Sequence, residues 1–256
     1  MTKTEITTMV CLHDLLGYGD MVSVSGGTLD SAVGKIAHQR ISMLRKTISE
    51  VRKEFPADTT FFQMNDSAVA VCDVEHDIGS MHVESTAISS KTPSPTSAIK
   101  LLKFVCGCAH LHQSTLKKEQ IERIGPAGRT FIVLGKRWPI ENHDDTIIDV
   151  PQLQANLAYA EAYMADLAGS KAGFLGRVWE NIYLNDLMCF FLGTIKTCIP
   201  DKINLLNQRL SVKNDFPKSI LTPDSQKIEL TIFHRKRSFY SIMSHHTIDI
   251  NRILEL

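Results

Sequence analysis

Apolar positions in the first part of this chain follow two periods, one typical of strands and one typical of helices. Thr8–His13 is a short apolar run that predicts a strand. Over Leu29–Phe55, most apolar residues recur every three or four positions, which is the stripe of an amphipathic helix. Thr28 follows a flexible glycine pair and is the expected N-cap, and Pro56 ends the helix. The first predicted unit is therefore a strand followed by a long helix.

Two further strands are predicted directly after this helix, joined by a very short turn. They cover Thr59–Met64 and Ser67–Asp73, so only Asn65 and Asp66 separate them. Asn and Asp are favoured in two-residue hairpin turns because both tolerate positive φ angles. We therefore expect a hairpin with Asp66 at its tip, facing solvent or a functional site.

The central part of the chain predicts two more helices and one more strand, separated by polar loops. In chain order these are a helix at Ser97–Ile124, a strand at Arg129–Leu134 and a helix at Gln152–Leu167. The order of strand, helix, hairpin, helix, strand and helix predicts an α+β fold in which helices return over one sheet. The expected architecture is the ferredoxin-like, or split βαβ, sandwich with an antiparallel-containing sheet.

The last third of the chain adds elements of both kinds. Helices are predicted at Asn181–Thr197 and Ile203–Leu210, and strands at Ile228–His234 and Ser238–Met243. We expect one unit over residues 1–175 and a C-terminal extension over residues 176–256. The extension is expected either to add elements to the same sheet or to serve in dimerisation.

Composition and charge narrow the class of protein. Hydrophobic residues make up 43% of the 256 positions, which is typical of a folded globular chain. Lys plus Arg and Asp plus Glu number 28 each, and this balance argues against nucleic acid or an anionic membrane as a partner. The sequence has no signal-peptide pattern, no apolar run of roughly 18 residues and no zinc-ligand spacing among its cysteines. A cytoplasmic protein with reduced thiols is therefore expected.

Two aspartates are the strongest candidates for functional chemistry. Asp14 ends the first apolar strand and is followed by Gly17 and Gly19, which allow the backbone to approach phosphates. In a split βαβ sheet the first strand and the hairpin can be neighbours, so Asp14 and Asp66 would converge although they are 52 positions apart. Mg²⁺ and Mn²⁺ favour such oxygen ligands, with water and phosphate completing the shell. Singly, each aspartate fits a structural turn; together they favour a divalent-metal site.

Two segments resemble the signatures of class III nucleotidyl cyclase catalytic domains. In Val10–Tyr18 an apolar strand precedes an Asp, two apolar residues, a Gly and an aromatic residue. In Phe62–Val71 an Asp at a hairpin tip precedes an apolar strand, with Asn65 where Gly is common. The closest similarity is to bacterial pyrimidine cyclases of antiphage signalling and related cyclase-like proteins, in which a Ser follows the Asp, as Ser67 does here. Ala162–Asp166 is also similar to an Ala-Tyr-x-x-Glu stretch of that group.

The resemblance implies an activity and a set of site residues. The implied reaction converts a nucleoside triphosphate to a 3′,5′-cyclic nucleotide and pyrophosphate by two-metal catalysis with Mg²⁺ or Mn²⁺, and in its most specific form makes a cyclic pyrimidine messenger for antiphage defence. The implied enzyme is a homodimer with its sites between subunits. The implied metal ligands are Asp14, Asp66 and the backbone carbonyl of Leu15, and the implied nucleotide-binding residues are Gly17, Tyr18, Gly19 and Lys136.

The chain departs from the family at a position that matters for catalysis. The resemblance gives Asn156 a catalytic role, but the arginine expected four residues later is Ala160. That arginine stabilises charge in the transition state, which is often a large part of catalysis. Arg129 is the catalytic cation proposed in its place, although it could equally extend to solvent. The other candidate cations are Lys136, Arg137 and Lys171.

Three explanations of the missing arginine stay open. The cation comes from elsewhere in the protein, the protein is a slow cyclase, or it is a cyclase-like sensor or regulator that binds nucleotide without turnover. An unrelated ferredoxin-like binding module is a further functional class. The base of the nucleotide depends on a few pocket side chains that the sequence does not identify.

Overall fold

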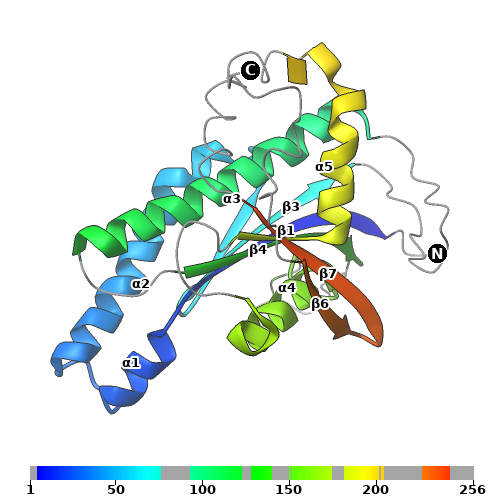
Figure 1. Cartoon of the computed structure of the whole chain (residues 1–256). Helices are drawn as coiled ribbons and strands as arrows, with labels where there is room; N and C mark the ends of the chain where they lie inside the picture. The colour runs from blue at the N-terminus through cyan, green and yellow to red at the C-terminus, as the bar shows by residue number, and fades with distance from the viewer. Residues whose placement is uncertain are drawn as a thin grey trace.

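A seven-stranded sheet organises the chain (Figure 1). The computed structural model describes residues 5–75, 93–122, 128–139, 150, 152–174, 182–201, 203–204 and 227–242. The strands lie in the order β2-β3-β1-β4-β5-β7-β6, and helices cover both faces of the sheet. Within the described residues, no helix combines the length and the apolar character that a membrane span needs.

The first four strands have the predicted split βαβ arrangement. β1 (Ile6–Leu15) lies between β3 (Ser67–Val74) and β4 (Gly128–Arg137), and β2 (Thr60–Met64) pairs with β3. All three pairings are antiparallel, so the predicted α+β, ferredoxin-like class is confirmed. The central position of β1 explains why this strand is buried along nearly its whole length.

The helices divide between the two faces of the sheet. α2 (Ala32–Val51), which continues into the short 3₁₀ helix η1 (Arg52–Glu54), lies with α3 (Pro95–Glu122) on one face. α5 (Asp186–Cys198) packs on the same face, whereas α4 (Leu157–Ala168) packs on the other (Figure 1). The sheet is therefore sandwiched between two hydrophobic cores.

The strands alternate their side chains between these two cores. On β1, Met9 and Cys11 belong to the core beneath α2 and α3, whereas Val10 and Leu12 belong to the core beneath α4. This period of two is what strand geometry requires. Asp14 continues the second series, so its side chain lies on the α4 side at the point where that core ends.

The segment between β1 and α2 differs from the prediction. A short helix, α1 (Tyr18–Val24), has no buried residue and therefore left no apolar stripe to predict it. Gly26 and Gly27 both have positive φ angles, so the chain turns there before the long helix begins. The N-cap is Ser31, whose hydroxyl accepts a first-turn amide at 3.0 Å; the prediction of Thr28 was wrong.

The C-terminal elements join the same sheet. β5 (Ile182–Asn185) runs parallel to β4, and the hairpin of β6 (Lys227–Ile232) and β7 (Arg235–Ile242) adds to its far side. The predicted helix over Asn181–Thr197 was wrong at its start, because β5 comes first and Asn185 then caps α5. Of the predicted helix at 203–210, only 203–204 are described. The boundary between residues 175 and 176 stays a prediction.

Candidate functional site

Asp14 and Asp66 lie beside each other at one end of the sheet. Asp14 pairs in register with Ser67, the first residue of β3. Asp66 precedes Ser67 in the two-residue turn, and its carbonyl accepts a hydrogen bond from the Leu15 amide at 3.1 Å. Asn65 adopts a positive φ of 52°, which lets the turn close. The hairpin tip is thus tied to the end of β1, and this brings the two aspartates together.

A row of three polar side chains crosses the strands at this end. Ser67, Asp14 and Arg129 occupy directly opposed positions on β3, β1 and β4. Cross-strand partners face the same side of a sheet, which here is the side of α4. The Ser67 hydroxyl donates to Oδ1 of Asp14 at 2.8 Å. Asp14 therefore has a hydroxyl donor on one flank and an arginine on the other.

Both carboxylates are in surroundings that disfavour their charge. Burial raises the pKa of Asp14, and the hydrogen bond from Ser67 and the charges of Arg129 and Arg40 offset this only in part. Burial also raises the pKa of Asp66, and the charge of Asp14 raises it further. Neighbouring carboxylates of this kind are stabilised in their charged form by a cation.

The donor set fits Mg²⁺ or Mn²⁺ bound together with a phosphate-bearing substrate. Among the described residues, no three His, Cys, Asp or Glu side chains are grouped so that they could hold one ion. In the same part of the chain, neither Asp14 nor Asp66 belongs to an ion pair. Mg²⁺ is commonly held by one or two carboxylates and completes its shell with water and substrate phosphates. Two adjacent carboxylates are therefore a sufficient set of side-chain donors.

Arg129 is held by α4. Its Nη2 lies 2.9 Å from Oδ1 of Asp166 and donates to the Asp166 carbonyl at 3.3 Å. Arg129 is only 9% exposed, so the alternative in which it extends to solvent was wrong. The pKa of Asp166 is raised to about 6, mainly by burial and further by the charges of Asp14 and Asp66, although Arg129 opposes the rise. Asp166, to which the sequence pattern gave no role, therefore belongs to the same electrostatic neighbourhood.

The residues predicted to approach the phosphates follow β1 directly. Gly17 has a φ of 75° and is the N-cap of α1, whose first residues are the half-buried Tyr18 and the exposed Gly19. A Cβ added at Gly19 would meet no atom within 4 Å, so the backbone is open at that position. Leu15 is buried, at 1% exposure, at the end of β1. These residues lie at the same end of the sheet as Asp14, and their binding roles stay predictions.

Lys136 and Asn156 lie at the opposite end of the sheet from Asp14. The register of the antiparallel strands pairs Asp14 with Arg129, and Lys136 is seven positions further along β4. At strand spacing this is roughly 23 Å. Asn156 forms an isolated bridge with Arg137, the neighbour of Lys136. Within one chain, Lys136 and Asn156 therefore lie far from the two aspartates, and their roles in a site between subunits stay predictions.

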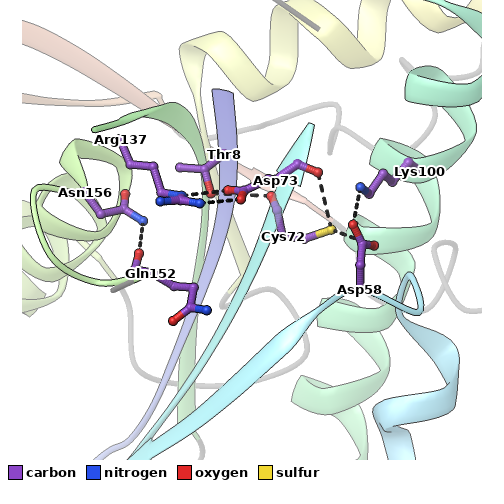
Figure 2. A network of polar contacts seen from close by, with 8 residues as sticks. All are labelled: Thr8, Asp58, Cys72, Asp73, Lys100, Arg137, Gln152 and Asn156. Atoms are coloured by element: carbon purple, nitrogen blue, oxygen red, sulfur yellow. Dashed lines mark hydrogen bonds and ion pairs between the residues drawn. The ribbon is translucent and has the colours of Figure 1, made fainter. Parts of the chain in front are cut away.

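Ion pairs occupy the cations at this second end. Arg137 binds both carboxylate oxygens of Asp73, at 2.8 and 2.6 Å (Figure 2). Lys136 forms an ion pair with Glu5. Two of the candidate replacements for the missing arginine are thus remote from Asp14 in the same chain. Lys171 is exposed and lies in a 3₁₀ turn after α4.

Asn156 has a structural role in the chain itself. It is the N-cap of α4, where its Oδ1 accepts the Tyr159 amide at 2.9 Å. Its Nδ2 donates to the Gln152 carbonyl at 2.8 Å (Figure 2). The helix predicted from Gln152 therefore begins only at Leu157, because Asn156 ends the preceding turn and caps the helix.

A buried ion pair beneath the Asp14 end was also missed. Arg40 of α2 and Glu119 of α3 are 0% and 1% exposed, and Nε and Nη2 of Arg40 lie 2.7 and 2.6 Å from the same carboxylate oxygen. Arg40 also contacts the sulfur of Met21 in α1 at 3.7 Å. Its positive charge opposes, in part, the rise that burial causes in the pKa values of Asp14 and Asp66. The sequence signal was the position of Arg40 inside the apolar stripe of its helix.

Solved structures with a similar fold include several nucleotidyl cyclases. The adenylyl cyclase CyaB from P. aeruginosa matches with a TM-score of 0.46 and 11% identity, over 93% of this chain and 94% of that one. The guanylyl cyclase Cya2 matches with a TM-score of 0.47 and 12% identity, over 94% of both chains. A dimeric guanylyl cyclase domain of the RhoGC fusion protein from the aquatic fungus Blastocladiella emersonii matches with a TM-score of 0.39 and 12% identity, over 94% of this chain and 97% of that one.

These proteins belong to the class that the two sequence signatures resemble, but with TM-scores below 0.5 the likeness assigns no activity to this chain. No protein-family model matches the sequence, and no curated protein matches it either. A functional assignment therefore depends on the site itself.

Proposed function

We propose that this chain is a nucleotidyl cyclase that converts a nucleoside triphosphate to a 3′,5′-cyclic nucleotide and pyrophosphate. The observation that carries the proposal is the convergence of Asp14 and Asp66, joined through the 3.1 Å hydrogen bond between the Leu15 amide and the Asp66 carbonyl. Burial and mutual repulsion raise the pKa of Asp66, and burial raises that of Asp14, so a bound cation would relieve both. Such a pair suits Mg²⁺ or Mn²⁺ carried by a triphosphate.

In the proposed reaction, different residues at this end of the sheet bind the metal and make room for the phosphates. Asp14 and Asp66 hold the metal, and the Leu15 carbonyl is a further ligand. The backbone at Gly17 and Gly19 leaves room for the phosphates. Bound divalent ions stabilise the attacking and leaving oxygens of an in-line displacement. In the proposed reaction the ribose 3′-hydroxyl attacks the α-phosphorus and pyrophosphate leaves.

A second copy of the chain completes the proposed site. Asn156, Lys136 and Arg137 lie at the opposite end of the sheet from Asp14. A two-fold symmetric homodimer with antiparallel subunits would set these residues of each copy against the Asp14 end of the other. Lys136 or Arg137 would then supply the cation that is absent at Ala160, once released from its own ion pair.

The outer face of α4 supports an interface with a second copy. Tyr163, Met164 and Leu167 are 50%, 40% and 67% exposed, and Leu157 on the same helix is 41% exposed. A group of exposed apolar side chains on one helix is typical of a protein–protein interface. Replacing Leu167 with Glu is expected to shift the chain from dimer to monomer in analytical ultracentrifugation, whereas the same change at the exposed Val24 of α1 should not.

Subunit mixing tests the shared site directly. Asp14→Asn and Asn156→Ser are each expected to be inactive, and Ser is chosen at 156 because it is also a good N-cap. Mixed dimers would contain one intact site, so an equal mixture is expected to recover about a quarter of the wild-type activity. A mixture as inactive as its parts would rule out the two-fold dimer with shared sites.

The cyclase proposal itself is tested with each of the four nucleoside triphosphates and Mn²⁺, with cyclic product separated by chromatography. Asp66→Ala is expected to lower the rate at least roughly 100-fold, since it removes a metal ligand. Asp30→Ala is the matched control, because Asp30 is an exposed aspartate outside the site. No product from any triphosphate, or undiminished product in Asp66→Ala, would contradict the proposal.

The most specific form of the proposal is a pyrimidine substrate and a role in antiphage signalling. It is supported by the sequence similarity around Asp66 and Ser67 alone. The same assay decides it, because faster turnover of ATP or GTP than of CTP and UTP would contradict it.

A nucleotide-binding regulator without turnover is the second candidate. Two observations favour it: Ala160 stands where the family has an arginine, and Arg129 is engaged by Asp166. Calorimetry would then detect triphosphate binding that Asp66→Ala abolishes, while no metal yields a cyclic product.

A further inference from the structure

Arg129 forms its ion pair with Asp166 and not with Asp14, the carboxylate directly opposite it in the sheet. It is paired in register with Asp14 on the neighbouring antiparallel strand, and both side chains lie on the α4 side of the sheet. Opposite charges at such positions commonly interact across the strands. Here Nη2 of Arg129 lies 2.9 Å from Asp166 instead, while Asp14 takes its hydrogen bond from Ser67.

Two groups of Asp166, near the end of α4, hold the Arg129 guanidinium, and Gly169 leaves space for it. The Asp166 carboxylate pairs with it, and the Asp166 backbone carbonyl accepts a hydrogen bond at 3.3 Å. Carbonyls in the last turn of a helix carry partial negative charge, which attracts a cation. A Cβ at Gly169 would lie 3.0 Å from Nη1, so the glycine gives the guanidinium space that a side chain would narrow.

The position of this guanidinium determines what Asp14 can bind. Oδ1 of Asp14 already accepts the Ser67 hydroxyl, which leaves Oδ2 as its less committed oxygen. Arginine binds carboxylates strongly and often through both oxygens. If Arg129 paired with Asp14, it would neutralise the carboxylate and compete with a divalent ion for the same oxygen atoms.

We propose that Asp166 is a positioning residue that keeps Arg129 off Asp14 and so leaves Asp14 available to a divalent ion. This inference rests on the proposed function, because it assumes that Asp14 is a metal ligand. Asp166 acts through Arg129 and is not a third ligand, since the described part of the chain contains no three such side chains grouped around one ion.

Calorimetric titration of the full chain with Mn²⁺, without nucleotide, tests this role. Asp166→Ala is expected to weaken Mn²⁺ binding about tenfold or more, the effect of one competing charge-assisted hydrogen bond. The double variant Arg129→Met/Asp166→Ala is expected to bind Mn²⁺ at least as tightly as wild type, because the competitor is gone. A crystal structure of Asp166→Ala is expected to have Arg129 within hydrogen-bond distance of Asp14.

Glu161→Ala is the matched control. Glu161 is another buried carboxylate of α4, and it pairs with a sheet arginine, Arg237, at 3.1 Å. Its loss is expected to lower the melting temperature without changing Mn²⁺ affinity. Unchanged Mn²⁺ affinity in Asp166→Ala would overturn the inference, because Arg129 would then stay away from Asp14 unaided. A double variant as weak as Asp166→Ala would overturn it too, because Asp166 would then act directly.

Asp14→Asn separates a failure of this inference from a failure of the proposed function. If wild type binds no Mn²⁺, or if Asp14→Asn leaves its binding unchanged, the metal site and the proposed function fail together with the inference. If Asp14→Asn abolishes binding while Asp166→Ala leaves it unchanged, only the positioning role fails.

Discussion

Ser67 and Asp14 lie directly opposite each other on β3 and β1, and the serine hydroxyl donates to the Asp14 carboxylate at 2.8 Å. This hydrogen bond stabilises the charged form of a carboxylate whose pKa burial raises. It joins the two signature segments through side chains, in addition to the backbone bond between Leu15 and Asp66. Ser67, the residue after Asp66, therefore affects how strongly Asp14 can bind a metal.

Ser67→Ala is expected to raise the pKa of Asp14 further, because the variant loses a bond to the ionised form. Protons would then compete better with the metal, so Mn²⁺ affinity should fall more steeply between about pH 8 and about pH 5.5 than it does in wild type. Calorimetry at both pH values measures this. Ser170→Ala, at an exposed serine, is the control. Equal pH profiles for Ser67→Ala and wild type would count against a role for this hydrogen bond.

The raised pKa of Asp166 predicts a pH dependence of stability. Its folded value of about 6 exceeds the ordinary value of 3.8, so between these two values the folded state binds more protons than the unfolded state. The free energy of unfolding should therefore fall as pH rises through this window, by at most about 3 kcal/mol from this group. Asp166→Asn should remove that part of the slope.

Urea unfolding of wild type and Asp166→Asn at several pH values from about 4 to about 7 measures this difference. Asp30→Asn, at an exposed position, should follow the wild-type profile. Parallel profiles for wild type and Asp166→Asn would show that Asp166 is not the group responsible.

The buried pair of Arg40 and Glu119 predicts a strongly coupled pair of substitutions. Arg40→Met leaves the Glu119 carboxylate buried without its cation and is expected to destabilise the fold by about 3–5 kcal/mol. Arg40→Met/Glu119→Leu is expected to recover most of this loss, because an apolar pair of similar volume replaces both charges. Glu50→Gln, which breaks the half-exposed pair with Lys118 between the same two helices, should cost no more than about 1 kcal/mol.

Urea unfolding of all the variants at one pH gives these values. A double variant no more stable than Arg40→Met would contradict the coupling. It would also show that α2 and α3 need the arginine for more than the neutralisation of Glu119.

Gly128 predicts a steric limit at the start of β4. A Cβ there would lie 2.6 Å from the His13 ring and 2.7 Å from the Asp14 carbonyl oxygen. Gly128→Ala must therefore displace β4 from β1 and is expected to cost about 1–3 kcal/mol. In Gly193→Ala the new methyl group meets nothing within 4 Å, so this helical substitution should instead stabilise by about 0.5–1 kcal/mol. Thermal unfolding of both variants distinguishes the two effects, and equal shifts would contradict the steric argument.

The sequence by itself determined the strand, helix and hairpin unit that brings Asp14 and Asp66 together. Apolar residues with a period of two or of three to four specify which local structure buries them. A two-residue Asn-Asp turn then fixes the register of its hairpin. Elements with a weak local pattern were missed for the same reason. α1 buries no residue, and β5 is only four residues long and runs straight into α5.

Only the tertiary structure decided the partners of the charged residues. Arg129 and Asp166 are 37 positions apart, and Arg40 and Glu119 are 79 positions apart. Periodicity indicates the face on which a side chain lies, but a charged group on that face pairs with whatever the packing of another element brings within reach. The same packing put Asn156 at the far end of the sheet from Asp14. In the antiparallel pair, Asp14 at the end of β1 lies opposite Arg129 near the start of β4, so Arg137 at the end of β4, which bridges to Asn156, lies at the other end.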